Sequence, residues 1–242
     1  MPGKTKGGRR MFRRNNKARA KTNYRKRRGL QNLSLQVMPK IKYATHRYAE
    51  STQLFINNSF DAQLVYTLNG LFDPNVSGGS GAGINHQPYL FDQMNALYNK
   101  YCVLGAKVKI HLRPGSTSNS YAMNVFGETT QLSSVQYPGS IGLEKPGVKI
   151  VRFNSSASNV YTPARTMTFY WSAKKEFRAK DRQELITNED YSGTGSTLPN
   201  EQAYLYLTYQ AQQIQQTTAK LACDVIIDYI VAWTEPKQPN QS

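Results

Sequence analysis

The residues in this chain with the plainest chemistry are cations gathered within its first 28 positions. Thirteen of these residues are Lys or Arg, none is Asp or Glu, and Arg outnumbers Lys. The planar guanidinium of Arg matches phosphate oxygens well, and such a cluster favours a sequence-independent contact with a polyphosphate such as nucleic acid. The cations are Lys4, Lys6, Arg9, Arg10, Arg13, Arg14, Lys17, Arg19, Lys21, Arg25, Lys26, Arg27 and Arg28.

The charge of the chain is divided very unevenly along its length. Lys40, Lys42 and Arg47 follow the first thirteen cations before the first acidic residue, Glu50. Residues 1–47 therefore hold 16 of the 31 basic residues and none of the 15 acidic ones, so the rest of the chain is neutral. A neutral body with a cationic arm is suited to holding a polyanion while the body has another task. We expect all sixteen cations to contribute to nucleic-acid binding.

We expect the arm, residues 1–28, to be disordered when free, because it holds too few apolar residues to bury. A connecting strap at 29–46, a body at 47–236 and a short tail at 237–242 would follow. A Lys/Arg run of this kind can also act as a nuclear import address. The plainer alternative is a solvated tail that only aids solubility.

Motifs for nucleotide, metal or covalent chemistry are missing or incomplete in the sequence. Gly3-Lys4-Thr5 lacks the preceding glycine and strand of a phosphate-binding loop, and the glycines at 79, 81 and 83 have no strand leading into them. His46, His86 and His111 fall in separate segments, so we expect no metal site and no cofactor. No hydrolase nucleophile motif is present, so we expect no catalytic residues and a protein that is not an enzyme.

Other reactive side chains are better explained by packing. Cys102 and Cys223 lie on the apolar faces of predicted strands, which predicts buried, unreactive thiols. Asp224 and Asp228 share one strand face, and we expect them to pair with Lys107 or Lys109 or to face solvent; the alternative is a cation site between subunits. Five aromatic side chains could stack on nucleic-acid bases, but we expect them to pack in the core or in an interface. They are Trp171, Tyr204, Tyr206, Tyr209 and Trp233.

The elements that must position these residues are mostly strands. Residues 101–113 and 219–235 alternate between apolar and polar side chains, which predicts two long strands with one buried face each. The other predicted strands are 47–57, 60–69, 120–128, 147–153, 164–172 and 203–210. Eight strands with little helix predict an all-β fold, a sandwich or jelly roll.

The segments between the strands are long and rich in turn residues. The longest are 73–88, 128–146 and 174–202, with short helices expected within 89–99 and around 178–186. No apolar run reaches the roughly 18 residues needed to span a bilayer, so we expect no membrane insertion. The N-terminus lacks a signal-peptide pattern, which favours intracellular synthesis.

Four features together resemble the capsid proteins of circular Rep-encoding single-stranded DNA viruses, the circovirus-like group. They are the cationic arm on a neutral β body, the stretch FDQMNALYNKYCVLGAKVKIHLRP at 91–114, the stretch EDYSGTGSTLPNEQAYLYLTYQ at 189–210, and a long final strand at 219–235. The likeness covers nearly the whole chain, although Gly and Asn separate the basic clusters of the arm more than in well-known circoviruses.

The resemblance implies a single eight-stranded jelly roll made of two four-stranded antiparallel sheets. It also implies a closed icosahedral, T=1-like shell of about 60 copies that packages single-stranded DNA, with the arms inward and loops outward. The expected partners are other copies of the chain, the viral genome, a nuclear import receptor and a host-cell receptor, and the expected locations are the virion and the host nucleus. The alternatives are the capsid protein of a small RNA or satellite virus, and a cellular nucleic-acid-binding β protein.

Overall fold

Strands make up most of the structure, a computed structural model that describes residues 38–56, 61–77, 86–114, 121–134, 144–155, 164–211 and 219–237. The strands are β1 (Ile41–Ile56), β2 (Asp61–Thr67), β3 (Tyr98–Pro114), β4 (Tyr121–Thr130), β5 (Lys149–Ser155), β6 (Arg165–Ser172), β7 (Ser192–Thr194), β8 (Tyr204–Ala211) and β9 (Ala219–Pro236). The helices are α1 (Phe91–Leu97), α3 (Ala173–Glu176), α4 (Arg182–Thr187) and the 3₁₀ helix η3 (Glu189–Tyr191). Of the helices described, none is both long and apolar enough to span a bilayer.

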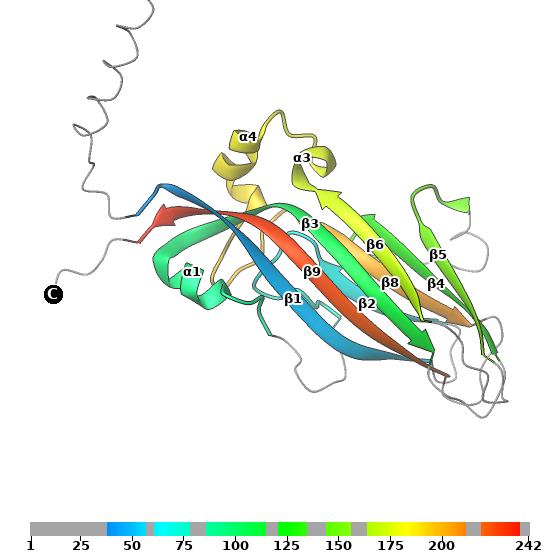
Figure 1. Cartoon of the computed structure of the whole chain (residues 1–242). Coiled ribbons are helices and arrows are strands. Elements are labelled where there is room, and N and C mark those ends of the chain that lie inside the picture. Colours follow the sequence, from blue (N-terminus) through cyan, green and yellow to red (C-terminus); the bar gives the residue numbers. More distant parts are fainter. Residues whose placement is uncertain are drawn as a thin grey trace, which may run out of the picture. The chain divides into compact units, whose positions relative to one another are not determined.

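The strands form two antiparallel sheets that face each other (Figure 1). One sheet has the order β1-β9-β3-β6, and the other has the order β2-β8-β4-β5. Successive strands along the chain mostly switch between the sheets, and this order is that of a jelly roll. The predicted all-β fold with eight principal strands in two four-stranded antiparallel sheets is therefore confirmed, and β7 adds a short ninth strand beside β3.

Each of the eight predicted strands corresponds to an observed one, but the first begins earlier than predicted. β1 starts at Ile41, so residues 41–46 of the expected strap belong to the sheet and pair with β9. The alternation was hard to see because the inward positions of this stretch hold Ala44 and His46 in place of large aliphatic side chains. Pro39, just before the strand, is consistent with a boundary at this point.

The core lies between the two sheets and is unusually aromatic. Seven of its largest fully buried side chains are Tyr, Trp or Phe on strands from both sheets: Tyr48, Tyr66, Tyr101, Phe153, Tyr209, Tyr229 and Trp233. The hydroxyl of Tyr229 on β9 donates a 2.8 Å hydrogen bond to the Thr67 carbonyl at the end of β2. Aromatic side chains bury large areas, and a tyrosine hydroxyl placed among them needs such a partner. The core therefore joins the two sheets by both apolar and polar contacts.

The alternation predicted in β9 holds along the strand, and in β3 it holds only after residue 105. In β9 every odd residue from Leu221 to Trp233 is buried, and in β3 the even residues from Ala106 to Leu112 share that inward face. Before residue 105 the parity of β3 is reversed, because Tyr101 and Val103 pair with the inward Trp233 and Val231, and Cys102 pairs with Ala232. A register shift between Val103 and Gly105 interrupts the pairing of β3 with β9. Because neighbouring strand residues point to opposite faces, the odd residues of β3 from Lys107 to Arg113 and the even residues of β9 from Asp224 to Ile230 lie on the outer face of the β1-β9-β3-β6 sheet.

Candidate nucleic-acid interface

Only three of the sixteen predicted nucleic-acid-binding residues lie in the described part of the chain. The thirteen between positions 4 and 28 lie outside it, so their predicted role remains a prediction. Lys40 comes directly before β1, Lys42 lies near its start and Arg47 lies further along it, and all three are exposed. Lys42 and Arg47 therefore belong to β1, an edge strand of one sheet.

The outer face of the β1-β9-β3-β6 sheet, called the platform below, presents a regular set of rows that run across the four strands. The register aligns Arg47, Asp228, Lys107 and Tyr170 in one row. Further rows contain Ala49, Ile226, Lys109 and Thr168, and then Ser51, Asp224, His111 and Thr166. At the β1 edge of these rows the Tyr89 backbone N–H donates to the Arg47 carbonyl at 2.9 Å. The four strands of the platform present basic, polar, apolar and aromatic side chains on this face.

Asp228 was expected to pair with Lys107 or Lys109 or to face solvent; it lies on the outer face with its side chain 27 % exposed, and its ion pair is with an arginine on β1. The Arg47 guanidinium donates from Nε to Oδ1 at 2.6 Å and from Nη2 to Oδ2 at 3.1 Å. This two-pronged geometry matches a carboxylate better than a single ammonium can. Arg47, predicted to bind nucleic acid, is therefore already engaged by a carboxylate.

Asp224 is likewise satisfied by neighbours on the flanking strands. Arg113 donates from Nη2 to Oδ2 at 2.8 Å, and the Ser51 hydroxyl donates to Oδ1 at 2.7 Å. Asp224 and Asp228 do share one face, as predicted. Among the described residues no group of three or more His, Cys, Asp or Glu side chains is placed to hold a metal ion.

The arginines thus neutralise the acids of the platform and leave two lysines in excess. Lys107 and Lys109 are two residues apart on β3 and share the outer face, and neither forms an ion pair within the described ranges. Lys107 Nζ lies 5.5 Å from the centre of the Tyr170 ring, although Lys107 is opposite Asp228 in the register. An ammonium near an aromatic ring in this way is a cation–π contact. The local arrangement is two surplus positive charges beside an aromatic ring.

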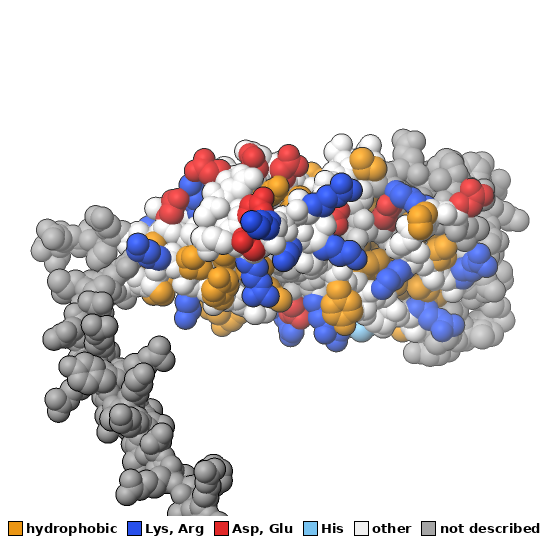
Figure 2. All heavy atoms as spheres, turned by 90° about the horizontal axis from the view of Figure 1, so that it is seen from above, with side chains coloured by type: hydrophobic (Ala, Val, Ile, Leu, Met, Phe, Trp, Pro, Cys, Tyr) orange, Lys and Arg blue, Asp and Glu red, His pale blue; other side chains and the backbone are white. Residues whose placement is uncertain are grey.

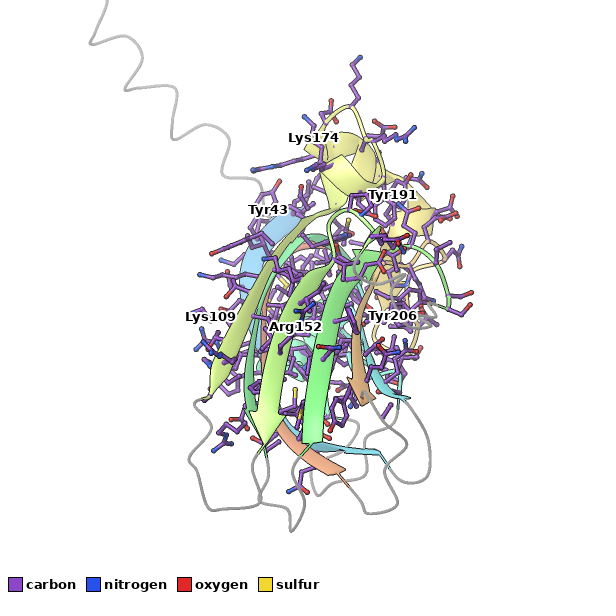
Figure 3. The ribbon with its side chains drawn as sticks, turned by 90° about the vertical axis from the view of Figure 1, so that its right-hand side faces the viewer. Tyr43, Lys109, Arg152, Lys174, Tyr191 and Tyr206 are labelled. Carbon is purple, nitrogen blue, oxygen red and sulfur yellow. The ribbon has the colours of Figure 1, made fainter. Side chains whose placement is uncertain are left out.

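Two exposed tyrosines of the platform were not identified by the sequence analysis. Tyr170 on β6 is 75 % exposed and Tyr43 on β1 is 55 % exposed. Figure 3 shows Tyr43 and Lys109 on the same side of the body, pointing outward, with Tyr206 on the opposite side. Strand parity could have revealed Tyr170, because it lies between Phe169 and Trp171 in the strand predicted at 164–172, and both of these are buried.

The aromatic residues that were considered for base stacking are mostly packed, as expected. Trp171, Tyr209 and Trp233 are buried in the core. Tyr206 is buried outside the main core, where it packs with Tyr204, Val65 and Val148, and its hydroxyl donates to the Leu132 carbonyl at 3.1 Å. These side chains therefore stabilise the sheets.

The three histidines each make different contacts. His46 is buried, and its Nδ1 donates to the Tyr89 carbonyl at 2.9 Å while Trp233 Nε1 donates to its Nε2 at 2.9 Å. His86 stacks on Tyr48 with ring centres 4.5 Å apart, and His111 Nδ1 lies 2.9 Å from the Thr166 hydroxyl on the platform. The hydrogen bonds of His46 require the neutral ring, and burial lowers the pKa of His46.

Cys102 and Cys223 are both buried and both free, in agreement with the prediction of unreactive thiols. Burial raises the pKa of each thiol to about 12. At neutral pH each side chain is therefore a protonated, apolar group within the core.

A polar hollow of about 510 Å³ lies away from the platform, where α3 and η3 approach the end of β4. Its lining consists of Gln131, Glu176, Phe177, Arg178, Tyr191 and Glu201. Two carboxylates against one guanidinium make this hollow a poor match for phosphate groups.

Comparison with known proteins yields only distant structural similarity. No protein family and no curated protein matches the sequence. The solved structures that align with it include the 60-mer BFDV capsid protein, with 11 % identity over 85 % of this chain and all of the other, at a TM-score of 0.42. They also include Desmodium yellow mottle tymovirus, with 15 % identity over 85 % and 94 % of the two chains at a TM-score of 0.37, and mud crab tombus-like virus, with 11 % identity over 85 % and 96 % at 0.39. The chain is thus similar, at this low level, to proteins of viral shells.

Proposed function

We propose that this chain is a structural capsid protein that assembles with copies of itself into a closed shell and packages nucleic acid through its cationic arm. The observation that carries the proposal is a jelly-roll body that is close to neutral, with 17 basic and 15 acidic residues from β1 onward, preceded in the chain by 40 residues with 14 basic and no acidic ones. A charge partition of this kind separates a building unit from a polyanion-binding arm. The observed strand topology supports a role of the body in forming the shell, and the sequence supports a role of the arm in binding nucleic acid.

The finer form of the proposal is an icosahedral, T=1-like shell of about 60 copies around single-stranded DNA. Sixty copies of residues 1–47, with sixteen cations each, would bring roughly a thousand positive charges together, which suits a genome of that order in nucleotides. Binding through phosphates carries no sequence information, so packaging would not depend on sequence. On this proposal the arm also serves as the nuclear import address, and outward loops contact a host-cell receptor.

Expression of the full chain followed by electron microscopy tests assembly. We expect closed particles of uniform diameter at physiological salt, with image averaging resolving 60 equivalent positions. A protein that stays monomeric at every concentration and salt level contradicts the proposal, and a ring or filament contradicts the closed shell.

Nuclease digestion of nucleic acid extracted from purified particles separates the DNA form of the proposal from the RNA alternative. We expect the contents of particles made in infected cells to be degraded by DNase and by a single-strand-specific nuclease, and to resist RNase. Sensitivity to RNase alone would show that the shell packages RNA, because a cationic arm binds both polymers.

Localisation of the full chain in cells tests the import role. We expect nuclear accumulation, because the cationic run has the composition of an import address. A variant in which Arg25, Lys26, Arg27 and Arg28 are replaced by Gln should stay in the cytoplasm. If that variant accumulates in the nucleus as strongly as the unmodified chain, these four residues are not the import address.

A further inference from the structure

We propose that the platform is a second nucleic-acid-binding site, in which Lys107 and Lys109 hold phosphates and Tyr170 stacks on an unpaired base. The proposal rests on the packaging function proposed above and extends it from the arm to the folded body. The occupant is single-stranded nucleic acid, with DNA and RNA sharing the chemistry that this site would recognise.

The first support is the way in which charge is distributed on the platform. The only two acidic side chains in its described rows, Asp224 and Asp228, are held by Arg113 and Arg47. Lys107 and Lys109 remain as surplus ammonium groups on adjacent outward positions of β3. A surface with paired acids and unpaired lysines is complementary to a phosphate backbone.

The second support is the position of Tyr170. Its ring is 75 % exposed on an edge strand, in the same row as Lys107, with Lys107 Nζ 5.5 Å from the ring centre. An exposed ring beside cations is the combination that single-strand binders use, since a base stacks on the ring while a cation contacts the adjoining phosphate. Neighbouring hydroxyls of Thr166 and Thr168 offer further donors to phosphate.

The third support is continuity with the arm. Lys40 and Lys42 lie at the start of β1, the opposite edge strand, and Tyr43 follows them on the outer face. The platform faces the viewer in Figure 1, and in Figure 2 this side of the molecule forms the lower margin of the view. Along that margin Figure 2 shows Lys and Arg side chains with hydrophobic side chains between them. Most of the visible acidic side chains lie in the upper half of Figure 2. Basic and aromatic side chains therefore continue across the platform to its β1 edge.

Cross-linking in the full chain locates the contact directly. A single-stranded oligonucleotide carrying 5-bromouracil is bound, irradiated and digested, and mass spectrometry identifies the modified residues. We expect a cross-link at Tyr170 that is lost in Tyr170→Ala and kept in Tyr170→Phe, because the ring and not the hydroxyl stacks. Tyr89 is equally exposed at 75 % but lies at the opposite edge of the sheet, where its N–H donates to the Arg47 carbonyl on β1, and it should carry none. Cross-links confined to the arm would overturn the proposal.

Affinity for single and double strands separates stacking from general charge attraction. We expect Tyr170→Ala to weaken single-strand binding by about tenfold at a salt concentration that screens the arm, and to leave duplex binding unchanged, because duplex bases are not free to stack. Tyr89→Ala serves as the matched control and should change neither. An equal loss for both nucleic acids, or no loss, would contradict a stacking role for Tyr170.

The salt dependence of binding tests the two lysines. Each phosphate contact with a single strand contributes about 0.7 to the slope of log affinity against log salt, so replacing Lys107 and Lys109 together by Gln should reduce that slope by about 1.4. The matched control replaces Lys174 and Lys175, two exposed lysines on α3, and should leave the slope unchanged. Equal slopes for the platform variant and the unmodified chain would overturn the phosphate contacts.

Particle formation, followed by electron microscopy, keeps this inference separate from the proposed function. Particles that form and package nucleic acid without cross-linking at Tyr170 would leave the capsid function standing and remove the platform site. Cross-linking at Tyr170 without any particles would support the platform site and contradict the capsid function. If Tyr170→Ala abolishes particles while single-strand affinity stays the same, the platform is a contact between copies of the chain and the inference is wrong.

Discussion

His46 is the buried residue whose ionisation bears most directly on packing. Its two ring nitrogens join three segments, since Nδ1 donates to Tyr89 before α1, Nε2 accepts from Trp233 on β9, and the ring itself belongs to β1. Phe91 packs against the same indole, with ring centres 5.7 Å apart. A proton on Nε2 would face the Trp233 N–H and remove that hydrogen bond, so only the neutral ring fits the folded state.

We predict that the stability of unassembled subunits falls as the pH drops below about 6.5, the ordinary pKa of histidine. Burial lowers the pKa of His46 in the folded state, so the unfolded chain takes up the proton first and acid favours unfolding. Urea denaturation at pH 8 and pH 5, followed by tryptophan fluorescence, measures the loss. His46→Gln should show a smaller loss than the unmodified chain, whereas His111→Gln should show the same loss. Identical pH dependence in His46→Gln would contradict this assignment.

The two cysteines give a second prediction at the residue scale. With burial raising the pKa of Cys102 and Cys223 to about 12, only about one thiol in ten thousand is ionised at pH 8, and neither is accessible. We predict no reaction with an aromatic disulfide reagent in the native protein and two equivalents after unfolding in denaturant. Release of one equivalent without denaturant would show that one of these strands opens readily.

At the scale of elements, the two sheets depend on a close approach between β4 and β6. Gly127 on β4 faces the ring of Phe169 on β6, and a Cβ placed there would lie 2.5 Å from that ring and 2.9 Å from the Met167 methyl. Those side chains belong to the buried face of β6, so they have little room to withdraw. Glycine at this position lets the core close.

We predict that Gly127→Ala lowers the free energy of unfolding by roughly 1–3 kcal/mol, because the added methyl overpacks the core. Thr129→Ala on the same strand, where the side chain is only partly buried, should cost less than about 1 kcal/mol. Chemical denaturation of both variants measures the difference. Equal stability of Gly127→Ala and the unmodified chain would show that β4 and β6 can shift apart without cost.

Strand existence could be predicted from this sequence because the signal is local. β9 alternates so regularly that its buried face follows from side-chain parity alone, and the jelly-roll order was expected only through the resemblance to a known family. In β3 parity gives the buried face only from Ala106 onward, because the register shift between Val103 and Gly105 reverses it and puts Cys102 opposite Ala232. The start of β1 was missed because its inward residues, Ala44 and His46, do not look like a core. The short β7 was missed because its three residues, Ser-Gly-Thr, carry no alternation, and only pairing with β3 makes them a strand.

The candidate site was harder to predict, because partners are set by register between distant strands. Parity placed Asp228 and Lys107 on one face, and the observed register does put them opposite each other. It could not show that Arg47, 181 positions away in the chain, lies on the other side of Asp228 and satisfies both of its oxygens. That choice frees Lys107 to approach Tyr170, so the chemistry of the platform appears only in three dimensions.

At the scale of the whole molecule, the division of charge sets how the arm and the body can share a polyanion. Residues 1–47 carry the full excess of +16, and the rest of the chain carries equal numbers of acidic and basic residues. A neutral body does not repel other copies of itself through net charge, so contacts between bodies can form at physiological salt. The cationic arm would repel other arms until a polyanion neutralises it, which makes assembly and packaging favour one another.

We predict that deleting residues 1–28 removes most nucleic-acid binding and leaves the body folded. Thirteen cations lie in the deleted segment, so for single strands the slope of log affinity against log salt should fall by up to about 9. Filter binding across a salt series measures the slope, and circular dichroism checks the fold. A second variant that keeps the segment but replaces its thirteen cations by Gln separates charge from length and should behave like the deletion. If either variant still packages as much nucleic acid as the unmodified chain, the arm is not the main binding element. The platform would then be the main nucleic-acid-binding site.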